Sequence, residues 1–181
     1  MTMILDGSSG VTFPNSTVQA SSGVVLQVVS TTKTDTFSTT STSFTDITGL
    51  SVSITPKFST SKILVIFNTY TSANQNSSSA AIRLLRNSTA IDVGDAASTR
   101  PQASGIFYTG DVSVSVQASI GVVSNNFLDS PATTSATTYK LQMASANASV
   151  TMYINRTSSD RDSTTYDART ASSITVMEIA G

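Results

Sequence analysis

Reactive side chains are scarce in this chain of 181 residues, and their types exclude most enzymatic chemistry. Histidine and cysteine are both absent, so neither a Ser-His-Asp triad nor a catalytic thiolate can form. No motif brings two aspartates together as the carboxylate pair of a glycosidase would require. The sequence therefore predicts a protein that is not an enzyme, with no catalytic residues and no cofactor.

The densest group of acidic residues lies near the C-terminus. Asp160, Asp162 and Asp167 are close in sequence, and Ca²⁺ is bound by several oxygen ligands held close together. Arg161 and Arg169 are interleaved with these aspartates and neutralise them. No glycine or glutamate completes an EF-hand pattern, so we predict no metal site in this loop.

Five further side chains leave a binding role open. Glu178 is the sole glutamate; it could bind a cation, pair with an arginine near a trimer axis, or act as a charged strand residue that limits aggregation. Aromatic rings could stack on sugars or could belong to the core and its rim. The tyrosines to which this choice applies are Tyr108, Tyr139, Tyr153 and Tyr166.

The elements that must position these residues are predicted from composition. Charged residues make up 12% of the chain, about half the usual share in globular proteins, and serine and threonine take their place. Threonine favours strands through its branched Cβ atom. With 39% hydrophobic residues, this composition is typical of an all-β extracellular or virion protein.

Charge and hydropathy also exclude two classes of partner. The net charge is −1 and no run of basic residues exists, so the sequence offers no electrostatic footprint for nucleic acid. No apolar span approaches the roughly 20 residues of a transmembrane helix, and residues 1–6 lack the features of a signal peptide. The absence of cysteine fits synthesis in a reducing cytoplasm.

The chain is organised around residues 63–67 (ILVIF), its densest apolar run. Five residues with β-branched enrichment are typical of a strand. Because both alternating sets are apolar, we predict a central strand that is buried on both faces. Other runs, at 50–55, 112–117, 139–144 and 150–155, alternate apolar with polar residues, as strands with one wet face do.

These runs predict an antiparallel jelly-roll β-sandwich over residues 23–181, with about eight to ten strands and no convincing helix. The apolar members of the runs are expected to be largely buried. They are Leu50, Val52, Ile54, Ile63, Val65, Phe67, Leu141, Met143, Val150, Met152 and Ile154.

Two expectations concern the later strands. The runs at 139–144 and 150–155 are separated by a short Ala-Asn-Ala turn, which predicts that they pair as a hairpin. Residues 121–130 show no alternation and are expected to be irregular, with Phe127 and Leu128 as anchors.

Residues 1–22 form a separate, extended segment. It has two short apolar pieces split by a Gly-Ser turn and ends in a linker of small residues. It is too short to bury its apolar side chains itself, so we predict an anchor that docks on a partner; a flexible tail is the alternative. The expected anchor residues are Ile4, Leu5, Val11, Phe13 and Val18.

Part of the same segment resembles a known protein family. Residues 10–19 (GVTFPNSTVQ) resemble a motif near the N-terminus of many phage fibre-like proteins, close to Gly-Val-Thr-Phe-Pro-Asp-Gly-Thr-x-Gln; Asn-Ser stands here in place of Asp-Gly. Residues 24–50, 127–139 and 173–179 look like a domain common in phage structural proteins.

This resemblance implies a tumour-necrosis-factor-like jelly roll, often a homotrimer, exposed on a virion. We therefore expect a non-enzymatic fibre protein of the tail, baseplate or head, made in the host cytoplasm and docked on other virion proteins. A host surface glycan is a further expected partner. Two alternatives remain: a trimeric capsid decoration protein and, from another class, a free carbohydrate-binding module.

Overall fold

A computed structural model describes most of the chain, namely residues 4–6, 10–12, 18–19, 23–110 and 118–181. The described residues form β-strands and loops without an α-helix. Accordingly, none of them belongs to a helix that could cross a membrane. The predicted strand at 112–117 lies outside the described residues.

Fourteen strands are present in the described part of the chain. They are β1 (Ile4–Asp6), β2 (Gly10–Thr12), β3 (Val18–Gln19), β4 (Val25–Lys33), β5 (Phe37–Thr39), β6 (Thr45–Ile54), β7 (Lys62–Ala73), β8 (Ser79–Arg86), β9 (Thr89–Ile91), β10 (Gly105–Tyr108), β11 (Gly121–Asp129), β12 (Thr137–Ser145), β13 (Met152–Ile154) and β14 (Ser172–Ile179).

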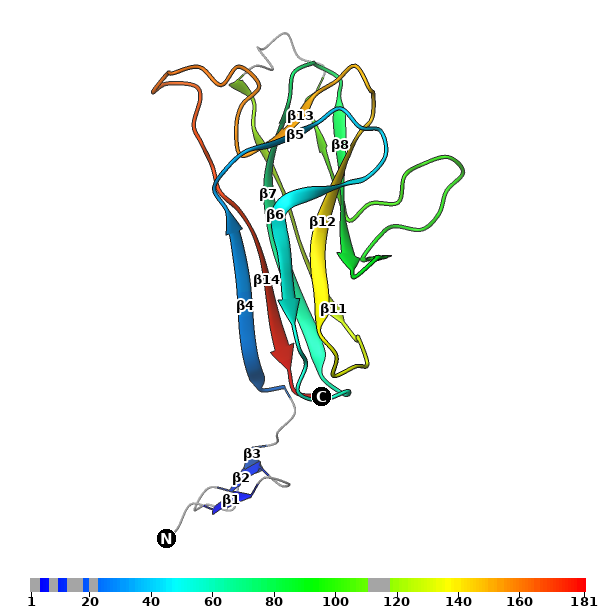
Figure 1. Cartoon of the computed structure of the whole chain (residues 1–181), viewed down its shortest axis with the longest axis vertical. Helices are drawn as coiled ribbons and strands as arrows, with labels where there is room; N and C mark the ends of the chain where they lie inside the picture. Colours follow the sequence, from blue (N-terminus) through cyan, green and yellow to red (C-terminus); the bar gives the residue numbers. More distant parts are fainter. Residues whose placement is uncertain (1–3, 7–9, 13–17, 20–22, 111–117) are drawn as a thin grey trace.

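From β4 onwards the strands build two antiparallel sheets packed face to face (Figure 1). One sheet has the order β4-β14-β7-β13-β5, with β11 also paired to β7. The other has the order β10-β8-β12-β6, with β9 paired to β8. Because the chain passes repeatedly from one sheet to the other between strands, the fold is a jelly-roll sandwich. The predicted fold class is confirmed.

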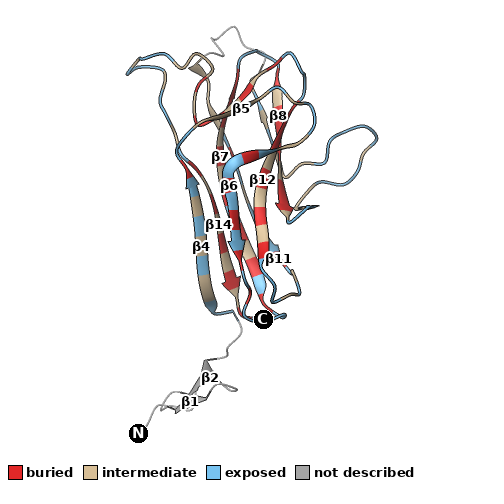
Figure 2. Ribbon diagram, viewed as in Figure 1, coloured by how far each residue is buried: buried red, intermediate tan, exposed pale blue. Residues whose placement is uncertain are grey.

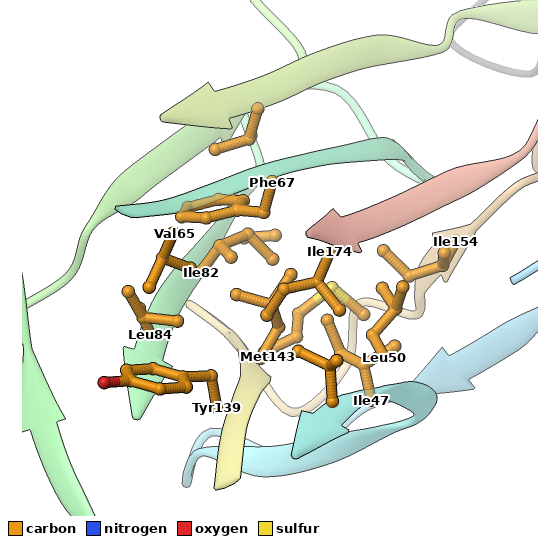
Figure 3. Close-up of a cluster of buried hydrophobic side chains, with 14 of the residues drawn as sticks. Ile47, Leu50, Val65, Phe67, Ile82, Leu84, Tyr139, Met143, Ile154 and Ile174 are labelled. Atoms are coloured by element: carbon orange, nitrogen blue, oxygen red, sulfur yellow. The ribbon is translucent and has the colours of Figure 1, made fainter. Parts of the chain in front are cut away.

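The core lies between the sheets and is built from alternating positions, as Figure 2 shows along β7 and β12. Side chains from both sheets interdigitate in it, among them Phe67, Leu84, Met143 and Ile174 (Figure 3). Every one of the eleven residues expected in the core is buried. Period-two alternation therefore identified the inward faces correctly.

The central strand differs from expectation on one face. Strand β7 is central, because β14, β11 and β13 all pair with it. However, Leu64 is only half-buried and Ile66 is 41% exposed. The prediction that both faces are buried is wrong, because the paired strands cover the edges of β7 and the second sheet covers one face.

The prediction that residues 139–144 and 150–155 pair as a hairpin is also wrong. Strand β12 pairs with β6 and β8, whereas β13 pairs with β5 and β7 in the opposite sheet. The turn between the two strands is therefore a corner that carries the chain across the core. Alternation is the same in both arrangements, so the sequence pattern could not separate them.

Residues 121–130 were expected to be irregular, but all of them except Ser130 form a regular strand, β11. The inward positions of β11 include Asn125 and Asp129, so polar residues interrupt the alternation that would have indicated a strand. Phe127 does pack against the core. Leu128, the other expected anchor, points outward and is 56% exposed.

Both chain termini of the sandwich lie at one end (Figure 1). The N–H of Gly23 donates to the carbonyl of Ala180 at 2.7 Å, and the N–H of Ala180 donates to the carbonyl of Val24 at 2.9 Å. Strands β1, β2 and β3 form a small antiparallel sheet of their own beyond this end.

Two buried carboxylates fasten the sandwich. Asp129 accepts two hydrogen bonds from Arg86, at 2.8 and 3.0 Å, and one from the hydroxyl of Tyr139, at 2.6 Å. Burial, together with this bond to Asp129, raises the pKa of Tyr139, so the phenol keeps its proton. The cluster joins β11 of one sheet to β8 and β12 of the other.

Glu178 fastens the end that carries the termini. Its carboxylate accepts hydrogen bonds from Gln27 Nε2 at 2.5 Å, the backbone N–H of Lys57 at 2.6 Å and the hydroxyl of Ser61 at 2.7 Å. Burial opposes ionisation, but these bonds outweigh it and hold the pKa of Glu178 below its ordinary value of 4.5. The side chain is buried and does not act as a charged surface residue.

We predict that Glu178→Gln lowers the free energy of unfolding by about 2 kcal/mol near neutral pH, because hydrogen bonds to a charged group stabilise more than neutral ones. Since the folded-state pKa is depressed, this stabilisation is complete above pH 4.5 and is lost as the pH falls through the folded-state pKa. Urea unfolding of both proteins should therefore show a smaller difference at about pH 3 than at about pH 7.

The matched control is Asp95→Asn, which removes an exposed carboxylate and should leave stability nearly unchanged at both pH values. A difference between the wild type and Glu178→Gln that does not change with pH would contradict the role assigned to the ionised carboxylate.

Candidate assembly surface

The outward face of the sheet β4-β14-β7-β11 carries a row of apolar side chains. Met177 is in register with Val28 on one side and with Leu64 on the other, and Leu64 is in register with Leu128. Val28 is 55% exposed and Leu128 is 56% exposed. The row thus crosses four strands on the side of the sheet that faces away from the core.

Neighbouring positions enlarge this row into a continuous surface. Ile66 follows Leu64 outward along β7, and Ile179 pairs with Val25 next to the chain termini. We name this surface the apolar face; its residues are Val25, Val28, Leu64, Ile66, Leu128, Met177 and Ile179. A contiguous patch of exposed apolar side chains often marks an interaction site.

The apolar face has a polar border and carries no charge of its own. At one margin Lys62 donates to the hydroxyl of Ser130 at 2.8 Å. Towards the far end, the hydroxyls of Ser30 and Thr175 lie 2.7 Å apart in a hydrogen bond. A neutral apolar centre with hydrogen-bonding residues around it is the arrangement found at protein–protein interfaces.

The outward face of the other sheet has the opposite character. Arg83 Nε donates to Gln142 at 2.9 Å, and Gln142 Nε2 donates to Asp46 at 2.6 Å. Lys140 also binds Asp46, at 2.7 Å, and with Gln142 lowers the pKa of that carboxyl. Arg83 further stacks over Phe44, with its Cζ atom 4.0 Å from the ring centroid. The side chains on β6, β8 and β12 satisfy one another, whereas Ile106 on β10 is 65% exposed on the same side of the sheet.

The contrast between the two faces indicates which one a partner would cover. Burial of apolar surface favours association. None of the seven residues of the apolar face is charged, and the nearest charge is that of Lys62, which is in register with Ile179 at the margin. Sequence reasoning missed this surface, although its signal was present in the unbroken apolar run around Leu64 and Ile66. Leu64 and Ile66 were expected to be buried, but they lie on the outward face of the sheet.

The expected anchor residues fall on the small N-terminal sheet where they are described. Leu5 is in register with Val11, while Ile4 and Val18 are both in register with Thr12. The structure therefore brings four of them into two adjacent cross-strand rows. Phe13, the fifth, lies outside the described residues.

Two of the three aspartates considered for calcium, Asp160 and Asp167, are used in ion pairs, and Asp162 is exposed. Asp160 pairs with Arg169 at 2.8 Å, and Asp167 pairs with Arg161 at 2.6 Å. In the ranges that the structure describes, no group of three metal-ligating side chains comes together. The carboxylates of Asp160 and Asp167 are paired with arginine guanidinium groups.

The four tyrosines have separate environments. Tyr139 is buried in the core, and Tyr153 lies beneath Arg156, whose Cζ atom is 4.3 Å from the ring centroid. Tyr108 and Tyr166 are exposed on different elements. The rings of the last two are the more exposed, and the Cζ atom of Arg161 lies 5.7 Å from the centroid of the Tyr166 ring.

Comparisons with known proteins add no family to this description. No protein-family model matches the chain, and no curated protein matches it either.

Proposed function

We propose that this chain is a non-enzymatic structural protein of a bacteriophage virion, a homotrimeric fibre that docks on other virion proteins through residues 1–22. The observation that supports assembly is the apolar face, which spans four strands and has no layer over it. The phage setting is supported by the resemblance of residues 10–19 to the fibre motif.

A closed ring of three copies suits the position of the apolar face. In a ring of three, each interface joins one patch of a copy to a different patch of the next copy. An apolar face turned toward the threefold axis would be covered in all three copies. An axis along the strands would place all three N-terminal segments at one end, next to the junction of Gly23 with Ala180. Three small sheets gathered there would form an anchor that one copy is too small to make alone.

The same features support a trimeric capsid decoration protein, whose N-terminal segment would bind capsid subunits. A carbohydrate-binding module is the alternative from another class, and the exposed ring of Tyr166 favours it. Such a module would need neither the N-terminal anchor nor the apolar face, so assembly and docking distinguish the two proposals.

Disruption of the apolar face tests assembly. We expect Leu128→Lys to reduce the molar mass in solution from that of a trimer to that of a monomer, because three lysines would be buried without partners in each ring. The substitution should cost little folding stability, since the side chain is more than half exposed. Light scattering coupled to size exclusion at micromolar protein measures the mass.

The matched control is Ser124→Lys, which places the same charge on the outward side of the same strand but beyond the apolar face. This variant should remain trimeric. A wild-type protein that is monomeric at this concentration, or a Leu128→Lys protein that stays trimeric, would contradict the assigned interface.

Removal of residues 1–22 tests docking separately. The truncated chain should remain folded and trimeric, because its sandwich and apolar face are intact, yet it should no longer be incorporated into particles. Quantitative blotting of purified virions from a complementation experiment measures incorporation. Recovery of the truncated protein on particles at the full-length level would rule out the anchor, and its failure to fold would show that the segment belongs to the domain.

A further inference from the structure

The loop that joins β9 to β10 projects sideways from the sandwich (Figure 1). We name this loop, residues 92–104, the side arm. One side chain of β11 holds its two ends together: Nδ2 of Asn125 donates to Asp92 Oδ2 at 2.7 Å and to the carbonyl of Ser104 at 3.4 Å. The hydroxyl of Ser104 in turn accepts from the N–H of Leu84 at 2.9 Å. The side arm therefore has a fixed base beside β8 and β11.

The side arm also has hydrogen bonds of its own. The N–H of Gly94 donates to the carbonyl of Ala103 at 3.3 Å, and Nε2 of Gln102 donates to the carbonyl of Gly94 at 2.7 Å. These two bonds join the outgoing and returning limbs of the arm. Near the tip, the N–H of Arg100 donates to the carbonyl of Ala97 at 3.1 Å and closes a turn. The arm thus has a defined course from base to tip.

Packing on its own sandwich does not account for the side arm. Open hollows of about 410 and 280 Å³ lie between the arm and the strands β8 and β10. Pro101 lines both hollows from the arm, and Ala81 and Ile106 line them from the strands. Between residues 94 and 102 only Ala97 is not fully exposed. The arm is therefore a fixed projection whose side chains are open to a partner.

Arg100 at the tip of the side arm has no partner of its own. It is exposed, and its guanidinium makes no hydrogen bond or ion pair with any residue that the structure describes. Each of the other arginines binds a carboxylate, a backbone carbonyl or a glutamine through its guanidinium. Guanidinium groups pair most strongly with carboxylates. The tip therefore fits a partner that presents a carboxylate.

The proposed ring determines which surface lies next to the side arm. In the sheet that carries the apolar face, β4 is the edge strand on one side, and β11 lies on the other side of β7. A threefold axis that runs along the strands, with this sheet turned toward it, brings the β11 side of each copy to the β4 edge of the next copy. Because the side arm is based on β11, it lies beside the β4 edge of the neighbouring copy.

The neighbouring β4 edge presents a carboxylate at the matching height. Figure 1 shows the side arm level with the upper end of β4, where the chain leaves the strand after Lys33. Asp35 follows in the next turn, and its side chain is 77% exposed. Lys33 Nζ donates to Asp35 Oδ1 at 2.8 Å, which lowers the pKa of Asp35 and keeps it ionised. A carboxylate accepts several hydrogen bonds, so Asp35 can bind an arginine as well.

We propose that the side arm of each copy docks on the β4 edge of the next copy, with Arg100 bound to Asp35. The inference rests on the proposed trimer and deepens it, because it adds a polar contact between neighbours to the apolar face. The arm and the β4 edge lie on opposite sides of the sandwich, so the contact closes a ring and does not suit a two-fold dimer. It also fixes how far one copy can slide along the next.

Cross-linking of introduced cysteines tests the contact, because the chain has no cysteine of its own. The full-length protein carrying both Thr99→Cys and Thr34→Cys is treated with a flexible bis-maleimide at low micromolar concentration. We expect covalent dimers and trimers on a denaturing gel. Each single variant should stay monomeric on that gel, because equivalent positions are separated around the ring. The matched control combines Thr99→Cys with Ser59→Cys, an exposed position at the terminal end, and should not cross-link.

A charge reversal tests the ion pair. Arg100→Glu should raise the concentration at which half of the trimer dissociates by about tenfold, because three exposed ion pairs in each ring become contacts between like charges. In an Asp35→Asn background the same substitution should change that concentration by less than about twofold. Light scattering over a dilution series measures the dissociation of all four proteins.

The outcomes separate the side-arm contact from the trimer. A trimeric Thr99→Cys/Thr34→Cys protein that forms no intermolecular cross-link, or that cross-links no better than the control pair, would overturn the contact and leave the trimer standing. An Arg100→Glu effect of equal size in both backgrounds would overturn the pairing with Asp35. A wild-type protein that is monomeric at micromolar concentration would overturn the trimer and the side-arm contact together.

Discussion

The structure depends on one constraint: the space between two packed sheets holds a single layer of interdigitated side chains. Each strand can therefore bury one face only. Phe67 and Val65 occupy that layer from one sheet, and Leu84 and Tyr139 occupy it from the other. Everything on the outward faces is left to water or to a partner, and the character of those faces decides how the protein can interact.

The outward faces of the two sheets differ in polarity. One is covered by its own polar network around Asp46 and Gln142, which resembles ordinary solvated surface. The other exposes Val28 and Leu128 without any charge among its central residues. Because the two ends of the sandwich chain lie at one end and residues 156–170 at the other, the molecule has a direction as well as two unlike sides.

The chain has few charged residues, and the buried carboxylates of Glu178 and Asp129 join separate elements. Glu178 binds side chains and backbone from two segments at the terminal end, β4 and the loop between β6 and β7, and Asp129 joins strands from both sheets. Each carboxylate has its hydrogen bonds supplied by the protein, which offsets the cost of removing it from water. These clusters hold together edges that apolar packing alone would leave free to slide.

Period-two alternation of residues such as Leu50, Val52 and Ile54 determined the fold class and the core without a structure, because side-chain direction in a strand is a local property. Which strands pair was decided only by tertiary structure: β12 and β13 look like a hairpin in sequence but lie in opposite sheets. The outward position of Ile66 and the gathering of Arg161 with Tyr166 were likewise invisible, since exposure and proximity depend on which layers cover a strand and where a loop folds back.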